Sequence, residues 1–251
     1  MEPKYRMTRE DNVFVAKRNI VDYIWKSARL EGLTVTYPDT DAIYNGMSVA
    51  NVPVDEIIAV NNLKHAWRFI LENLDYTIDY SYICHIHRLV GGDTLIRDAG
   101  CPRKIPVRIG GTSWRPDMPI ESQIKEQLAG ALAIENPTER AIMLTLYLMR
   151  KQIFLDGNKR TSMLAGNQVM IAHGCGIISV PVEHQTAFRN MLIAFYESGD
   201  TGELSRFLYE NCVDGMDFET SGHTSDSGAQ SASGVFNPAL ILSDIPGIDV
   251  K

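Results

Sequence analysis

The part of the sequence best suited to chemistry is Gln152–Arg160, which joins two stretches of helical periodicity. Gly157 lets the backbone turn tightly and lets a ligand come close. A helix predicted to begin at Asn158 would present free N–H groups and the positive end of its dipole, which together favour an anion. Lys159 and Arg160 add two cations at that end, where the dipole alone disfavours them. This combination predicts a loop that binds phosphate.

Two more side chains in this stretch suit such a loop. Asp156 comes just before the turn, where its carboxylate could hold Mg²⁺ against the phosphate groups. Phe154 is most simply an apolar anchor for the loop. From spacing alone, an ordinary helix-loop-helix with solvated basic side chains is an equally good interpretation.

The stretch resembles the signature of the Fic (Fic/Doc) family, H-x-F-x-[DE]-G-N-[GK]-R. The resemblance extends over about residues 8–212 and implies a mainly α fold, a Fic-type helical bundle with a short β-hairpin flap ahead of the signature. It also implies an activity, the transfer of AMP from ATP to a Ser, Thr or Tyr hydroxyl of a target protein. Six positions match in order: Phe154, Asp156, Gly157, Asn158, Lys159 and Arg160.

The same resemblance implies roles for these residues, with ATP and Mg²⁺ as the expected cofactors. Asp156 would hold Mg²⁺. The nucleotide would be bound by Phe154, Gly157, Asn158, Lys159 and Arg160.

The signature's opening histidine is replaced by Gln152 in this chain. In the family that histidine is the general base for the attacking hydroxyl. A glutamine amide can orient a hydroxyl through hydrogen bonds but cannot take its proton near pH 7. Because loss of a positioned base costs about a hundred- to ten-thousandfold in rate, we expect the activity to be reduced or absent.

A second departure leaves three functions open. Many family members carry an arginine where this chain has Met163, and Lys159 stands where many have glycine. Both features resemble the Doc-type branch, which transfers phosphate. AMP transfer is the favoured interpretation because Asp156–Gly157 keeps the common Fic form. The alternatives are a non-catalytic nucleotide-binding regulatory protein and a Doc-type phosphotransferase.

A candidate inhibitory segment lies at the end of the first predicted helix. Ser27 and Glu31 continue an apolar stripe at helical spacing, and a buried carboxylate there needs a cationic partner. Ser27–Gly32 resembles the family's inhibitory motif, [ST]-x-x-x-E-[GN], whose glutamate occupies the region of the γ-phosphate. Because the usual arginine partner is missing, Arg160 or Lys159 would substitute for it.

A flap is predicted within Gly91–Pro119, a stretch rich in glycine and proline. Ile105, Val107 and Ile109 alternate like a strand before the turn signal Gly110–Gly111. In the family such a flap holds the target by strand pairing. These three residues are therefore the expected docking positions for a target protein. Self-modification and homo-oligomer formation are also compatible with the resemblance.

Periodicity and caps divide the chain into three regions. Residues 1–50 form an N-terminal region with the inhibitory helix, and residues 51–217 form the Fic domain. Residues 218–251 are predicted to be a disordered tail, because their Ser, Gly, Thr, Asp and Gln cannot build a packed core. Helices are expected at about 8–30, 61–74, 80–90, 120–133, 138–149, 158–173, 182–198 and 203–212.

The bulk properties exclude several functional classes. The formal net charge of −7 over 251 residues gives no basic field for nucleic acid. No apolar run reaches the ~18 residues that span a bilayer, and no signal peptide is recognisable. The cysteines are scattered, which favours neither a zinc site nor a disulfide framework. A bacterial-type cytoplasmic protein is expected, and export by a route without an N-terminal signal is compatible with these features.

Overall fold

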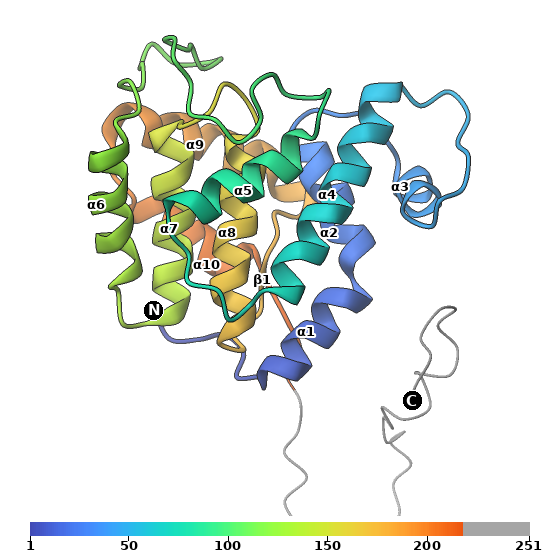
Figure 1. Ribbon diagram of the computed structural model, residues 1–251. Coiled ribbons are helices and arrows are strands. Elements are labelled where there is room, and N and C mark those ends of the chain that lie inside the picture. The colour runs from blue at the N-terminus through green and yellow to red at the C-terminus, as the bar shows by residue number, and fades with distance from the viewer. Residues whose placement is uncertain (218–251) are drawn as a thin grey trace, which may run out of the picture. The chain divides into compact units, whose positions relative to one another are not determined.

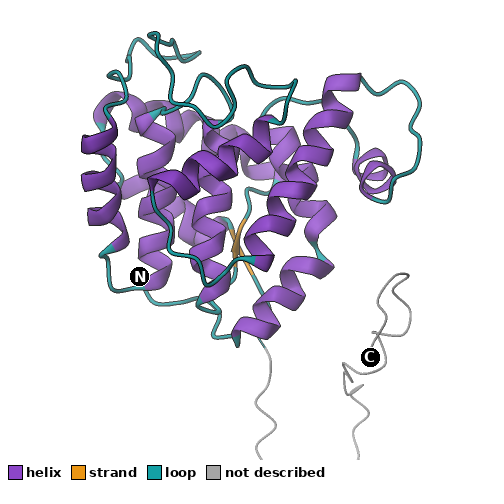
Figure 2. Ribbon diagram, in the orientation of Figure 1, coloured by secondary structure: helices purple, strands orange, loops and turns teal. Residues whose placement is uncertain are grey.

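The computed structural model describes residues 1–217, which belong to one compact unit and are mainly helical (Figures 1 and 2). The tail predicted to be disordered lies outside the described residues, and the boundary proposed at residue 50 stays a prediction. The elements in chain order are α1 Arg9–Arg18, α2 Ile20–Leu30, α3 Tyr37–Tyr44, α4 Val54–Glu72, α5 Tyr80–Gly91, α6 Glu121–Leu132, α7 Pro137–Lys151, α8 Asn158–Ala172, β1 Ile177–Ile178, a 3₁₀ turn Val182–His184, α9 Gln185–Ser198, α10 Gly202–Asn211 and β2 Val213–Asp214.

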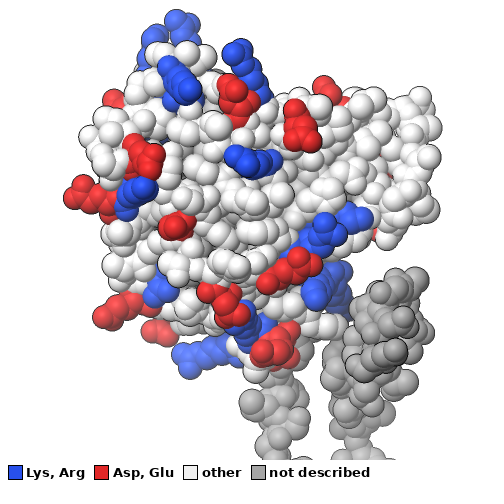
Figure 3. All heavy atoms as spheres, viewed as in Figure 1, with Lys and Arg blue, Asp and Glu red and all other residues white. Residues whose placement is uncertain are grey.

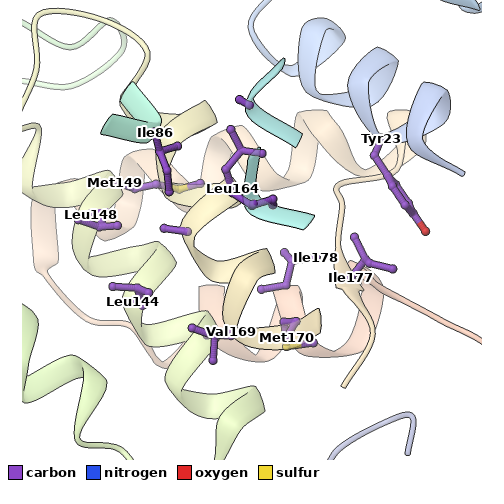
Figure 4. Packing of buried hydrophobic residues seen from close by; sticks show 14 of the residues in the cluster. Tyr23, Ile86, Leu144, Leu148, Met149, Leu164, Val169, Met170, Ile177 and Ile178 are labelled. Carbon is purple, nitrogen blue, oxygen red and sulfur yellow. The ribbon is translucent and has the colours of Figure 1, made fainter. Parts of the chain in front are cut away.

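Helix α8, the helix that begins in the signature, runs through the centre of the molecule (Figure 1). It packs against α7, α5, α4, α1 and β1. When a helix is buried on all sides, its side chains must be apolar or form hydrogen bonds within the protein. In Figure 4, Val169 of α8 lies on the side of Leu144 of α7, Leu164 lies near Ile86 of α5, and Met170 lies near Ile178 of β1, all within the core.

Gly166 allows α8 to approach α7 closely. A Cβ at this position would overlap the Oγ1 atom of Thr145 and lie 3.1 Å from the carbonyl oxygen of Ala141. The Thr145 hydroxyl is buried and already donates to that carbonyl at 2.8 Å, so it cannot move aside freely.

We therefore expect Gly166→Ala to lower the free energy of unfolding by about 1–3 kcal/mol through overpacking. The matched control is Gly130→Ala in α6, where a Cβ meets nothing within 4 Å. Higher helix propensity should make that control more stable by about 0.5–1 kcal/mol. Urea denaturation measures both, and equal effects of the two substitutions would contradict this account of the α7–α8 contact.

The N-terminal helices differ from the expected pattern. Thr8 and Asp11 form a capping box at the start of α1, but the predicted helix over 8–30 is broken at Asn19, which ends α1 and precedes α2. A second capping box, between Thr36 and Asp39, begins α3, where no helix was expected. The helix expected from residue 61 begins earlier, at Val54.

The flap also differs from the prediction. Residues 105–109 form no paired strand, and the two-stranded antiparallel sheet of the described residues joins β1 to β2 instead. The turn at Gly110–Gly111 is present within an irregular segment, residues 102–119, that we call the flap loop. The buried Arg103 guanidinium donates to the carbonyl groups of Ile105 and Pro116 (2.9 and 3.2 Å). These carbonyls are thus satisfied by a side chain rather than by a neighbouring strand.

None of the helices in residues 1–217 combines the length and apolar character needed to cross a membrane. In Figure 3, Lys and Arg side chains gather at the top of the view, over the flap loop, whereas both signs of charge are interspersed elsewhere on this face. The basic residues exposed on the flap loop are Lys104, Arg108 and Arg115.

Candidate active site

The signature residues form a loop between α7 and α8 whose two ends are left-handed. Gln152 has φ 49° and ψ 57° directly after α7, and Gly157 has φ 73° directly before α8. A Cβ on Gly157 would lie 2.7 Å from Cδ1 of Ile96 and 3.3 Å from Nε2 of His87. Glycine is therefore required at position 157 by both the backbone conformation and the space available.

The side chain of Asn158 holds this loop from within. Its Oδ1 accepts from the N–H of Phe154 (3.0 Å), and its Nδ2 donates to the carbonyl of Phe154 (2.9 Å) and to Oε1 of Gln152 (3.2 Å). The amide is thus committed to internal hydrogen bonds. Any contact of Asn158 with an anion would come from its backbone N–H at the beginning of α8.

Phe154 is the apolar anchor of the loop, with a side chain that is 2% exposed. It stacks on His87 of α5, with ring centroids 3.7 Å apart and an angle of 6° between the planes. The His87 Nδ1 accepts from the N–H of Gly100, and its Nε2 lies 2.8 Å from the carbonyl oxygen of Asp156. His87 lies outside the signature, and the sequence predicted no role for it in the site. Its position on the buried face of α5, with Ile83 and Val90, was the available signal.

Burial lowers the pKa of His87 from its ordinary value of 6.5 to about 4. An unfolded chain binds a proton at this residue below about pH 6.5, whereas the folded chain does not until about pH 4. The unfolded state therefore gains protons in this window, and stability falls as the pH decreases through it.

We expect His87 to contribute about 3 kcal/mol to the free energy of unfolding above pH 6.5, and this contribution should disappear between pH 6.5 and 4. Denaturant unfolding across this range checks it. Replacing His87 with Phe should flatten the dependence, while replacing the exposed His65 with Gln should leave it intact. An unchanged slope in His87→Phe would contradict the assignment.

The two cations of the signature meet a carboxylate that comes from another helix. Lys159 Nζ lies 3.1 Å from Oε2 of Glu31, and Arg160 Nε lies 3.7 Å from its Oε1. Nη2 of Arg160 also contacts Oδ2 of Asp156 at 3.4 Å. The Glu31 side chain is 14% exposed and Arg160 is buried. A carboxylate thus lies at the N-terminal end of α8, where the sequence predicted a place for phosphate.

Helix α9 holds the end of α2 that carries this carboxylate. Gln185 donates to the carbonyl of Lys26 (2.9 Å), and Arg189 donates to the carbonyls of Arg29 and Leu30 (2.9 and 3.0 Å). These bonds satisfy the free carbonyls at the helix end and place it against α8. None of them was foreseen, because donor and acceptor are about 160 residues apart.

The amide of Gln152 is oriented by hydrogen bonds. Its Nε2 donates to the carbonyl of Met149 (2.6 Å) and lies 3.4 Å from the hydroxyl of Tyr196. Tyr196 stacks on Trp114 of the flap loop, with ring centroids 5.5 Å apart. Burial, followed by the charge of Glu31, raises the pKa of Tyr196 above its ordinary value. The phenol therefore stays protonated at neutral pH and does not supply the base that Gln152 lacks.

The candidate site contains an open hollow of about 380 Å³. Of the expected docking residues, Ile109 lines the hollow, whereas Ile105 is 58% exposed and Val107 is half-buried. The hollow brings together the end of α2, the flap loop, the signature loop and α9, and its principal polar lining residues are Glu31, Arg108, Gln152, Asp156, Lys159 and Tyr196.

Ser27 lines a neighbouring cavity of about 20 Å³ rather than this hollow. Glu31 and Lys159 line both spaces. Met163 also borders the small cavity, and its thioether brings no charge to the place where many relatives would have a second arginine. The cationic partners of Glu31 are therefore Lys159 and Arg160, the two substitutes named from the sequence.

The donor set at Asp156 suits Mg²⁺ only together with a phosphate ligand. Its carboxylate is 68% exposed and accepts from the N–H of Gly157 at 2.6 Å. Residues 1–217 contain no group of three or more His, Cys, Asp or Glu side chains placed to hold a metal. Because Mg²⁺ commonly binds through one or two carboxylates plus water and substrate phosphates, a single carboxylate is sufficient when a nucleotide supplies the other oxygens.

Comparisons with known proteins agree with this geometry. Residues 77–170 match the family model described as "Fic/DOC family". A protein of Caenorhabditis briggsae named "Protein adenylyltransferase fic-1" is 28% identical over 179 residues, covering 66% of this chain and 34% of that protein. "Protein adenylyltransferase Fic" of Drosophila erecta is 26% identical, covering 76% and 40%. The chain thus spans between a third and two fifths of the length of these curated relatives.

Solved structures show the same fold. Fic-1 (residues 134–508) from C. elegans has a TM-score of 0.65 at 24% identity, covering 78% of this chain and 61% of that one. A Fic domain-containing signalling protein from Bacteroides thetaiotaomicron has a TM-score of 0.66 at 19% identity, covering 80% and 84%. The match to the Fic/DOC family model includes the loop between α7 and α8 that carries the signature, so residues 77–170 are similar to a Fic/DOC domain.

Proposed function

We propose that the chain is a Fic-type protein adenylyltransferase that transfers AMP from ATP to a hydroxyl group of a target protein and is self-inhibited through Glu31. One observation carries the proposal: Lys159 and Arg160 at the N-terminus of α8 are paired with a carboxylate from α2. An anion site built for phosphate and filled by a carboxylate explains why two cations lie where the helix dipole disfavours them. The names of the relatives support the choice of AMP transfer.

In this proposal the chain binds and orients ATP. The N–H groups at the beginning of α8 and the side chains of Lys159 and Arg160 neutralise the phosphate oxygens. Asp156 would hold Mg²⁺, which polarises the phosphate groups when it is bound. The flap loop would hold the target segment beside the hollow.

The transfer step is a displacement at the α-phosphorus. The target's hydroxyl oxygen forms a bond to this phosphorus, the bond to the bridging oxygen breaks, and pyrophosphate leaves. Gln152 can hold the hydroxyl through its amide but cannot accept the proton, which must pass to solvent. The reaction should therefore be slow in the chain as it stands.

The same contacts support the proposal of self-inhibition. The Glu31 carboxylate lies against the two cations that the terminal phosphates of ATP would need. ATP must displace this carboxylate before its phosphates can occupy the site productively. In this proposal the target segment, the nucleotide and the inhibitory carboxylate of Glu31 are all placed near the N-terminus of α8.

Labelled ATP tests the proposal against its two alternatives. AMP transfer places label from the α-phosphate on protein, whereas a Doc-type phosphotransferase places only γ-phosphate label there. A non-catalytic nucleotide-binding protein transfers neither label, yet ATP still raises its melting temperature. The absence of both label transfer and a melting shift would reject all three functions.

A further inference from the structure

His87 joins three parts of the candidate site although it lies outside the signature. Its ring is 1% exposed on α5. One face stacks on Phe154, Nδ1 faces the N–H of Gly100 at 2.8 Å, and Nε2 faces the carbonyl of Asp156 at 2.8 Å.

These partners admit one tautomer of a neutral ring. The N–H of Gly100 is a donor, so Nδ1 must accept. The ring proton is therefore on Nε2, which donates to the carbonyl oxygen of Asp156. A ring with both nitrogens protonated would lose the hydrogen bond from Gly100, and a neutral ring with its proton on Nδ1 would lose both hydrogen bonds.

The bond to Asp156 fixes the peptide group on which the anion site begins. In a trans peptide the C=O and the following N–H point in opposite directions. With the Asp156 carbonyl directed to His87, the N–H of Gly157 is directed away from it, toward the Asp156 carboxylate at 2.6 Å. The same ring lies beside the Cα of Gly157, where an added Cβ would be 3.3 Å from Nε2.

We infer that His87 is a positioning residue, which sets the Asp156–Gly157 peptide so that the Asp156 carboxylate and the first N–H groups of α8 face the nucleotide. It touches neither ATP nor the target and acts through Asp156. This role rests on the proposed function, because it concerns how the same loop binds Mg²⁺ and ATP.

Three substitutions separate the interactions of the ring. In His87→Gln, the amide nitrogen reaches the place of Nε2, so the donor to Asp156 is kept and the acceptor for Gly100 is lost. His87→Asn keeps an acceptor near Nδ1 and loses the donor. His87→Phe keeps only the stacking on Phe154.

Calorimetry of Mg²⁺ with ATP on the full chain gives the first readout. We expect the Kd to change by less than about threefold in His87→Gln and to rise by about tenfold in His87→Asn and His87→Phe, as for loss of one well-placed hydrogen bond. The melting temperature without nucleotide should fall in all three. A purely structural role would make the loss of affinity follow the loss of melting temperature. That result, or unchanged affinity in all three variants, would overturn the inference.

A nuclear magnetic resonance measurement is independent of nucleotide binding. The His87 ring should show the neutral form protonated on Nε2, and the amide signal of Gly157 should shift in His87→Asn but much less in His87→Gln. A ring protonated on Nδ1 would reject the positioning role even if the variants do not fold. If the parent chain does not bind Mg²⁺ with ATP, the proposed function fails, and the amide and ring signals still decide the role of His87.

Discussion

Gln152→His is expected to raise the rate of AMP transfer by about a hundred- to ten-thousandfold, the usual contribution of a positioned general base. Gln152 follows α7 in a left-handed conformation, which histidine adopts more readily than branched residues do. Gln152 lines the hollow, and hydrogen bonds from Asn158 and to Met149 hold its amide there. A ring nitrogen there would accept the proton that an amide cannot.

The measurement is the initial rate at which α-phosphate label from ATP becomes bound to protein at saturating ATP. Gln152→Asn is the matched control, because it keeps an amide and offers no base. It should not exceed the rate of the parent chain. If the asparagine and histidine variants are equally active, the rate does not depend on a base at position 152.

Glu31→Gln is expected to tighten the binding of ATP by about tenfold to a hundredfold. The substitution keeps the shape of the side chain and removes the charge that neutralises Lys159 and Arg160. Close charge pairs that are shielded from solvent couple by about 1.5 kcal/mol or more, and 1.4 kcal/mol corresponds to a factor of ten in affinity. Without nucleotide the variant should unfold more easily, because the buried Arg160 then keeps only its contact with Asp156.

Titration calorimetry with Mg²⁺ and ATP gives the affinity, and thermal unfolding gives the stability. Glu126→Gln is the matched control, since Glu126 is exposed on α6 and forms no ion pair within residues 1–217. It should change neither quantity appreciably. In a chain that also carries Lys159→Met, Glu31→Gln should raise the ATP affinity by a smaller factor, because the carboxylate and the lysine form an ion pair. Equal ATP affinity with and without the Glu31 charge would contradict self-inhibition.

The features that the sequence predicted are those whose chemistry is local. The loop between α7 and α8 could be placed from Gln152–Arg160 because the turn glycine, the cations and the helix N-terminus are neighbours in the chain, and its binding of phosphate stays a prediction. The beginning of helix α8 at Asn158 was predicted for the same reason. The mainly α fold followed from periodicity together with the resemblance.

What could not be predicted depends on contacts between distant segments. The pairing of His87 with Asp156 and the bonds from α9 to the end of α2 join residues that no periodicity relates. The alternating pattern over 105–109 is present in the sequence, but no strand pairs there. The Arg103 side chain donates to backbone carbonyls of the flap loop that a neighbouring strand would otherwise bind. Residue types alone do not show whether a side chain or a neighbouring strand donates to these carbonyls.

Intact-mass spectrometry tests the central claim most directly. The unaltered chain, Gln152→His, Glu31→Gly and the double variant would each be incubated with Mg²⁺ and ATP. The account predicts that the double variant gains the mass of AMP most strongly, that Gln152→His gains less, and that the two chains with Gln152 gain little or none. Addition of a phosphate mass, or equal addition of AMP to all four chains, would contradict it.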